Sequence, residues 1–204
     1  MKTSRKLSAS RKNTSSTSPG DERAYTTMTF GEAPVEIAAY DPSWPARFEE
    51  EKQLLRRALE QWLAGPIEHV GSTAVPGLAA KPVIDIMAGV QSLDASRPAI
   101  AAAAEQGYCY FPYRPESEHW FCKPSPAFRT HHLHLVPVRS AQWIRTLAFR
   151  EHLRANPAVA AEYEALKREL AKQHHFDREA YTEAKHPFIT RVTDLALGTG
   201  QRPA

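Results

Sequence analysis

The fold of this chain is decided by the stretch HVGSTAVPGLAAKPVIDI, residues 69–86. An apolar start, a middle of small and turn-forming residues and an apolar end predict a strand, a tight turn and a returning strand. Gly71 would let the backbone come close to a bound group. Ser72 and Thr73 offer hydroxyl and N–H groups that suit phosphate oxygens. The turn is therefore a candidate phosphate cradle.

Asp85 is the single charged residue of the predicted strand 83–87. An apolar run of this kind is typical of a strand that is buried on both faces. A carboxylate in such a place needs compensation, and a divalent cation is one way to supply it. The same residues also fit a structural interpretation, in which Ser72 caps a helix and Asp85 accepts hydrogen bonds from the backbone. The residues alone leave both interpretations open.

Working outward, strands dominate the first part of the chain and helices the last third. Strands are expected at 35–40, 67–70, 83–87, 108–113, 119–123 and 130–138. Helices are expected from Ser43 up to the Gly65-Pro66 pair, over 95–106, and from starts at Ser140, Asn156 and Asp177. This order predicts an α+β fold, in which a mixed β-sheet is packed by helices and followed by a helical C-terminal segment.

His132 and His134 stand two residues apart in the expected strand 130–138, so both imidazoles point to one face. His131 is expected to face the other way. Together with Asp85, the two imidazoles would form a mononuclear site for Zn²⁺, Mn²⁺ or Fe²⁺, which imidazole favours over Mg²⁺. The alternative is a pair of hydrogen-bonding histidines in a polar cleft.

Three basic residues near these motifs are candidate phosphate contacts, namely Lys81, Lys123 and Arg129. Lys123 and Arg129 flank a predicted hairpin turn at 124–126, beside the histidine strand. Solvation at the surface is the ordinary alternative for such side chains. Tyr181 and Lys185, one helical turn apart, are expected to pack a helix and to face solvent.

Several separate motifs, in order, resemble the GrpB family. They are YDPSWP at 40–45, the stretch 69–86, THHLH at 130–134 and YTEAKHPFI at 181–189. More remotely, the central stretch resembles the nucleotidyltransferase pattern of Gly-Ser followed by an acid-x-acid strand. The resemblance covers most of residues 35–197. It implies one nucleotidyltransferase-like domain over 31–198, followed by a short C-terminal tail, 199–204.

The resemblance also implies a function. Nucleotidyltransferases hold two divalent metals on three carboxylates, and the metals bind a triphosphate and activate a hydroxyl. Asp85 matches the first acid and is the implied catalytic residue, but Met87 stands at the second position and the third acid has no evident counterpart. The implied ligands are a nucleotide or phosphorylated small molecule and a divalent metal (Mg²⁺, Mn²⁺ or Zn²⁺), with nucleotidyl transfer as one outcome. A non-catalytic nucleotide-binding or regulatory module and a single-metal phosphohydrolase are the alternatives.

The net charge of +3 comes from the N-terminus. Residues 1–20 contain five basic residues and no acid, and subtracting these five charges from +3 leaves −2 on the rest. Residues 1–30 are predicted to form a disordered, basic, Ser/Thr-rich tail, and the remainder gives no strong nucleic-acid signal. No run approaches the about 18–20 apolar residues of a membrane span. Two cysteines make no disulfide framework, so a cytoplasmic protein is expected, with organellar targeting by the tail as the alternative. The sequence does not indicate an oligomeric state.

Overall fold

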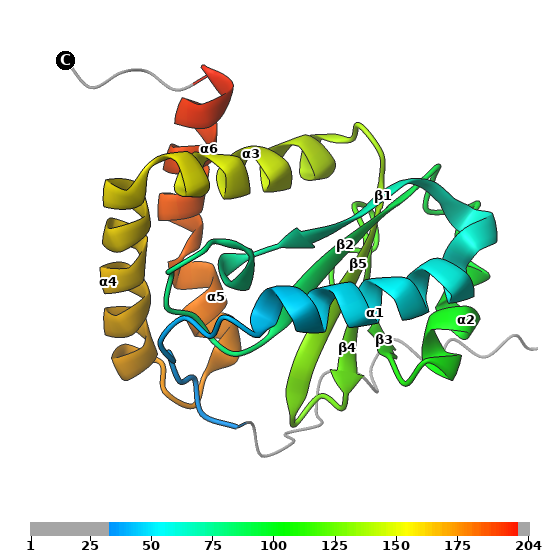
Figure 1. The fold of residues 1–204 in the computed structure, drawn as a ribbon, viewed down its shortest axis with the longest axis horizontal. Helices are drawn as coiled ribbons and strands as arrows, with labels where there is room; N and C mark the ends of the chain where they lie inside the picture. Colours follow the sequence, from blue (N-terminus) through cyan, green and yellow to red (C-terminus); the bar gives the residue numbers. More distant parts are fainter. Residues whose placement is uncertain (1–32, 200–204) are drawn as a thin grey trace, which may run out of the picture.

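The structure is a computed structural model that describes residues 33–199. A mixed sheet lies at its centre, and most of the C-terminal helices gather at one end of it (Figure 1). The predicted basic tail at 1–30 lies outside the described residues, as does all of the short C-terminal tail except Thr199.

The sheet has five strands in the order β1-β2-β5-β4-β3. β2 and β5 run parallel, while the pairs β1/β2, β5/β4 and β4/β3 are antiparallel. The parallel pair lies inside the sheet, and the candidate metal ligands Asp85, His132 and His134 come from these two strands. The strands are β1 (Leu63–Val70), β2 (Ile84–Val90), β3 (Cys109–Phe111), β4 (His119–Pro124) and β5 (Arg129–Pro137).

Within residues 33–199, six α-helices pack on the faces of this sheet or at one end of it, and short 3₁₀ turns follow α1 and β1. Among the described residues, none of the helices is both long enough and apolar enough to cross a membrane. The predicted α+β fold with a helical C-terminal segment is confirmed. The helices are α1 (Trp44–Leu59), α2 (Ala99–Glu105), α3 (Ala141–Ala155), α4 (Pro157–Gln173), α5 (Arg178–Ala184) and α6 (His186–Leu197).

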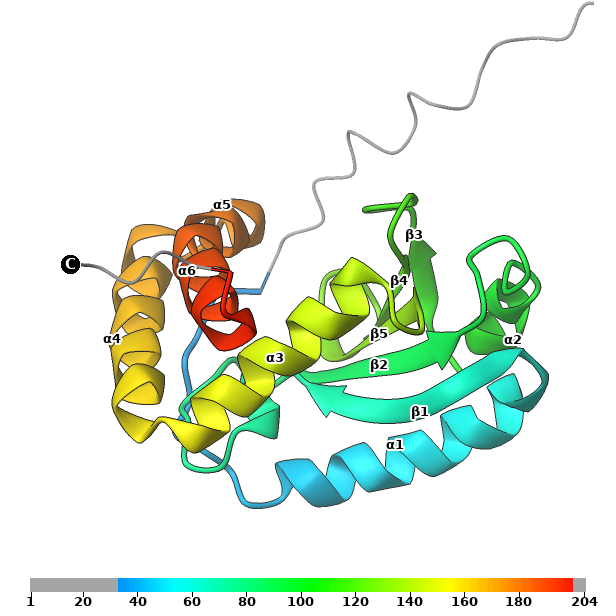
Figure 2. The same cartoon turned by 90° about the horizontal axis from the view of Figure 1, so that it is seen from above.

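The two faces of the sheet are covered by different helices. α1 lies on one side of β1 and β2, and α3 lies on the other (Figure 2). Alternate residues of a strand point to opposite faces, so each strand serves both layers. The face toward α1 holds the main apolar core, which includes Phe48, Leu55, Ile84, Ile86, Leu133 and Leu135.

The segment after Gly71 joins the sheet to the C-terminal helices. Val75 and Leu78 pack with Leu153 of α3, Tyr163 of α4 and Val192 of α6 in a second apolar cluster. Polar contacts reinforce this junction, because Arg154 donates to the carbonyl of Ala74 at 2.8 Å and Lys167 donates to the carbonyl of Ala79. These contacts hold the C-terminal helices against the segment that follows β1.

The expected first strand does not form. Within 35–40, the sheet-type contact is one isolated bridge between Ala38 and Ala80. Val35 instead donates its N–H to the carbonyl of His175, at the end of α4, and is buried there. The alternation of apolar residues is real, but its partner is a helix, so the segment does not extend the sheet.

Several boundaries also differ from the predictions. Gly65-Pro66 does not stop the first helix, which ends earlier, and the pair lies inside β1. The helix expected over 95–106 begins only at Ala99. The helix expected from Asp177 is split at Lys185 into α5 and α6. Pro187 has no N–H to continue the hydrogen-bond ladder, which explains the break.

Candidate functional site

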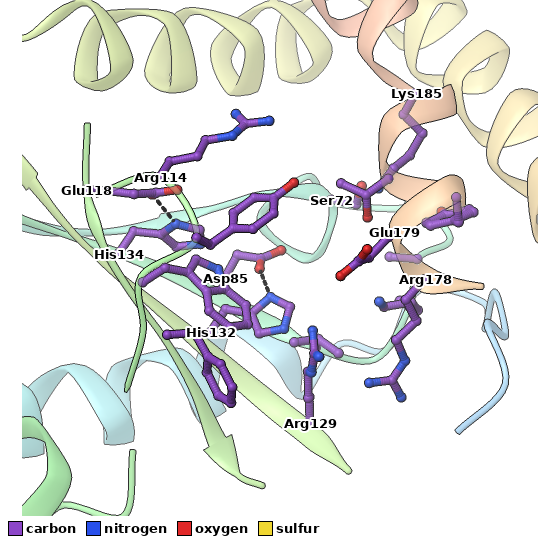
Figure 3. A pocket seen from close by; sticks show the side chains of 18 of the residues that line it. Ser72, Asp85, Arg114, Glu118, Arg129, His132, His134, Arg178, Glu179 and Lys185 are labelled. Carbon is purple, nitrogen blue, oxygen red and sulfur yellow. Dashed lines mark hydrogen bonds and ion pairs between the residues drawn. The ribbon is translucent and has the colours of Figure 1, made fainter. Parts of the chain in front are cut away.

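A cavity of about 690 Å³ lies between helix α5 and the sheet face opposite α1. Side chains from the strands and from α5 point into this space from opposite sides (Figure 3). Most of its lining residues are polar or charged. They include Ser72, Thr73, Lys81, Asp85, Arg114, Glu118, Arg129, His132, His134, Lys167, Arg178, Glu179, Tyr181, Lys185 and His186, with Phe111, Tyr113 and Trp120 on one wall.

Asp85, His132 and His134 meet on the floor of the cavity. Asp85 of β2 is the register partner of His132 on β5, so their side chains leave the sheet on the same side. One potential ligand atom from each of the three residues lies within 4.8 Å of the others. The parity expected for the two histidines thus places both of them beside Asp85 (Figure 3).

The pair of Asp85 and His132 is set up as an anion beside a neutral imidazole. Burial lowers the pKa of His132 to about 4, although Asp85 opposes this shift. Burial would raise the pKa of Asp85, but the hydrogen bond from His132 and nearby positive charges outweigh it and lower the pKa to about 2. At neutral pH, His132 therefore donates from Nδ1 to Oδ1 of Asp85 at 2.8 Å.

His132 has one nitrogen left over. Its Nε2 is buried and has no hydrogen-bond partner among the described residues. A neutral imidazole whose Nδ1 carries the proton keeps a lone pair on Nε2, and a buried acceptor without a partner is costly. The residues present therefore fit a divalent metal, since they offer imidazole nitrogen and carboxylate oxygen in one place.

A second carboxylate–histidine pair adjoins the first. Glu118, directly before β4, is buried, and its Oε2 lies 2.6 Å from Nδ1 of His134. Burial alone would lower the pKa of His134, but Glu118 outweighs it and raises that pKa. A carboxylate on Nδ1 fixes the ring and leaves Nε2 for a ligand.

Sequence reasoning missed Glu118, because it looked for a third acid as a metal ligand. Glu118 is instead bound to a histidine at the same site. One signal was available, since Glu118 stands two residues before Trp120, so that strand parity directs both to the same face. Both residues line the cavity.

Gly71 is required by its distance from Asp85. Its φ of 70° lies in the region that favours glycine, and a Cβ at this position would lie 2.2 Å from Oδ2 of Asp85. Ser72 begins the short 3₁₀ turn Ser72–Ala74 and lines the cavity. Thr73 is buried, and its hydroxyl donates to the carbonyl of Val83 at 3.3 Å and lies 3.0 Å from Nε2 of His69. The Thr73 hydroxyl therefore stabilises the turn by joining its two ends, at His69 and Val83.

The basic candidates separate into two groups. Lys81 and Arg129 line the cavity. Lys123 does not, because its ammonium group lies 2.8 Å from Oε1 of Glu51 on α1. Lys123 is paired in register with His131, and both face the α1 side of the sheet. The structure thus keeps Lys123 away from the other candidates.

Tyr181 of α5 and Lys185, directly after it, were expected to pack a helix and to face solvent, but both line the cavity. Tyr181 is buried, and Nζ of Lys185 lies 4.3 Å from the centre of its ring. Burial, together with the charge of Lys81, lowers the pKa of Lys185 to about 8. Nearby, Arg178 donates to the carbonyls of Ala33 and Pro126, which ties α5 to the chain around the cavity.

Comparison with known proteins gives consistent matches. The family described as GrpB protein matches residues 34–195. A UPF0157 protein of Pseudomonas aeruginosa is 39% identical over 173 residues, which cover 83% of this chain and 70% of that protein. The glutamate-rich protein GrpB of Alkalihalophilus pseudofirmus is 33% identical, over 78% of this chain and 93% of that protein.

A solved structure shares the fold. The crystal structure of conserved protein GrpB from Enterococcus faecalis aligns with a TM-score of 0.73 and 36% identity, over 80% of this chain and 98% of that one. The predicted nucleotidyltransferase-like α+β fold is confirmed by this likeness. A more distant relative, a dephospho-CoA kinase of Mycolicibacterium paratuberculosis, is 30% identical over 87% of this chain but only 50% of its own length.

Proposed function

The chain belongs to the GrpB family, and from this premise we propose that it binds a nucleotide or another phosphorylated small molecule, together with a divalent metal, in the cavity beside α5. The convergence of Asp85, His132 and His134, with ligand atoms within 4.8 Å of one another, carries the proposal. The excess of basic side chains on the cavity walls favours a negatively charged ligand.

The metal half of the proposal rests on the chemistry of the floor. Asp85, His132 and His134 would hold the ion, and Glu118 would orient His134 through Nδ1. A divalent ion in this place would offset phosphate charge and polarise phosphate oxygens. Two imidazoles favour Mn²⁺ or Zn²⁺ over Mg²⁺. Gly71 keeps the backbone close to Asp85 without crowding it.

The phosphate half rests on the charge of the walls. Basic side chains outnumber acidic ones in the lining, and a concave surface of one sign concentrates ligands of the other sign. Lys185 is affected both by the like charge of Lys81 and by the opposite charge of Asp85, and the charge of Lys81 acts more strongly. The basic residues are Lys81, Arg114, Arg129, Lys167, Arg178 and Lys185, against Asp85, Glu118 and Glu179.

Binding without nucleotidyl transfer is the second candidate function, and Met87 favours it. Met87 is 1% exposed and packs against Val70, Val136 and Trp143, so an apolar contact occupies the position of the second acid.

Pyrophosphate release from a nucleoside triphosphate would support transfer, whereas release of inorganic phosphate with Mn²⁺ or Zn²⁺ would support a single-metal phosphohydrolase. The match to a protein named dephospho-CoA kinase, which covers half of that protein's length, supports a nucleotide as the ligand. It is no evidence for kinase activity of this chain.

Calorimetric titration of chelator-treated protein with Mn²⁺ and Zn²⁺ tests the metal half. We expect one ion per chain in the wild type and no binding in His134→Ala. His131→Ala is the matched control, because His131 lies on the same strand but faces α1, and this variant should bind as the wild type does. Equal binding by His134→Ala and His131→Ala would contradict the proposed site.

The anion half is tested in the same instrument with inorganic tripolyphosphate. Lys185→Met should weaken binding, since the variant removes a basic group from the cavity lining. Lys172→Met, on the exposed side of α4, is the control and should leave binding unchanged. Failure of tripolyphosphate to bind the wild type at millimolar concentration would overturn this half.

A further inference from the structure

One wall of the cavity is aromatic and comes from the β3–β4 hairpin. Phe111 of β3 and Trp120 of β4 are paired in register, with ring centres 5.9 Å apart. Tyr113, in the connection between the strands, lies 6.3 Å from Trp120, measured between ring centres. All three rings line the cavity, so a continuous apolar surface faces a space whose other walls are mostly polar or charged.

This wall adjoins the carboxylate–histidine floor directly. Trp120 is the register partner of His134, and its ring centre lies 5.0 Å from that of His132. Arg178 and Glu179 of α5, and Lys185 directly after it, lie on the opposite side of the cavity (Figure 3). A ligand with its phosphates between the floor and α5 would therefore place its next chemical group against the hairpin.

Two rings of this wall already have a guanidinium group over them. The guanidinium of Arg129 lies 5.3 Å from the centre of the Trp120 ring, and that of Arg114 lies 5.2 Å from the centre of the Tyr113 ring. Tyr113 is also 47% exposed, although it belongs to a cavity and not to a convex surface. Flat, accessible aromatic faces in a concave site bind planar aromatic ligands, and every nucleobase offers such a face.

We propose that Tyr113, supported by Trp120 and Phe111, stacks the base of a nucleotide whose phosphates lie toward Lys81 and Lys185. This assignment rests on the proposed function and narrows its ligand from phosphorylated molecules in general to nucleoside phosphates. A sugar phosphate has no planar ring, so the aromatic wall would add little to its binding. Stacking tolerates different bases, so both purine and pyrimidine nucleotides should gain from the wall.

Two variants separate the effect of the Tyr113 hydroxyl from the effect of its aromatic face. Its hydroxyl donates to Oε1 of Glu183 at 3.3 Å, which ties the side chain to α5. Tyr113→Phe removes this hydrogen bond and keeps the aromatic face. Tyr113→Leu removes the aromatic face and keeps an apolar side chain. Phe176→Leu is a matched control, because Phe176 is exposed and does not line the cavity.

The test compares the affinities of ATP, UTP and inorganic tripolyphosphate, each with Mn²⁺, by calorimetry. We expect the wild type to bind ATP and UTP about tenfold or more tightly than tripolyphosphate, which corresponds to one stacked base. Tyr113→Leu should bring both nucleotides close to the affinity of tripolyphosphate and leave tripolyphosphate unchanged. Tyr113→Phe and Phe176→Leu should keep the preference. Thermal unfolding of each variant checks that it is folded.

The outcomes distinguish this inference from the proposed function. Equal affinity of the wild type for nucleotides and tripolyphosphate would overturn the aromatic subsite and leave the phosphate site standing. A nucleotide preference that survives in Tyr113→Leu would overturn the role of Tyr113. Loss of tripolyphosphate binding in Tyr113→Leu would mean that the residue shapes the cavity and does not stack a base. Failure of all three ligands to bind the wild type would overturn both proposals.

Discussion

The two faces of the central strands have opposite chemistry. On β2 and β5, Ile84, Ile86, Leu133 and Leu135 point toward α1, and each is fully buried. The residues that alternate with them on the same strands, Asp85, His132 and His134, point into the cavity. Because alternate residues change sides, a register slip of one residue would bury the carboxylate in the core and expose the leucines. The core face thus fixes the register that assembles the site.

His69 and His134, which lie on opposite faces of the sheet, have pKa values shifted in opposite directions. His69, on the α1 side of β1, stacks on Phe48 with ring centres 4.7 Å apart, and burial lowers its pKa to about 4. His134, on the cavity side of β5, is also buried, but Glu118 raises its pKa. Burial thus keeps the His69 imidazole neutral, whereas the charge of Glu118 outweighs burial at His134 and favours its charged form.

Leu133→Ala tests the core side of this comparison and should have the largest effect. Its side chain is fully buried between α1 and the sheet, and removing it leaves a cavity. We expect the free energy of unfolding to fall by about 2–5 kcal/mol, measured by urea denaturation. His132→Asn, one residue away, keeps an N–H group that can reach Asp85 and should cost less than about 1 kcal/mol. Similar losses in both variants would break the distinction between the faces.

Glu118→Gln tests the cavity side, with a smaller expected effect. The amide of the variant can still hydrogen-bond to Nδ1 of His134, but it lacks the negative charge that raises the pKa of His134. Loss of such a partner typically weakens metal binding about 10- to 100-fold, which calorimetry with Zn²⁺ or Mn²⁺ would measure. Glu116→Gln, in the same connection but exposed, should bind metal as the wild type does. Unchanged affinity in Glu118→Gln would remove the proposed positioning role.

The pH dependence of stability should show the smallest effect, with opposite signs for His69 and His134. The folded-state pKa of His69 lies below its ordinary value, so its contribution is present above pH 6.5 and is lost as the pH falls toward 4. The pKa of His134 is raised, so its contribution is present below pH 6.5 and is lost as the pH rises through the folded-state pKa.

Histidine chemical shifts against pH would measure both groups in the metal-free protein. His69→Gln should reduce the loss of stability between pH 6.5 and 4, while His132, whose pKa is also lowered, keeps part of it. If His69 titrates near 6.5, its neutral, stacked state is wrong. If His134 titrates below 6.5, the ion pair with Glu118 does not control it.

The sequence by itself determined whatever depends on the local geometry of the chain. The order of apolar runs predicted the α+β class, and the two-residue period of a strand put His132 and His134 on one face with His131 opposite. The motifs identified the family. Gly71 and Asp85 were singled out by their types and neighbours, and their closeness in space follows from the turn between them.

Only the tertiary structure decided which surfaces face one another. Lys123 lies on β4 with Trp120, but its side chain points to α1 and forms an ion pair with Glu51. Lys185 lies 100 residues beyond Asp85 in the chain and reaches the cavity because α3 and α4 carry α5 back to the sheet. Glu118 meets His134 because β4 pairs with β5. Strand pairing and helix packing depend on burial summed over the whole chain, which no local period records.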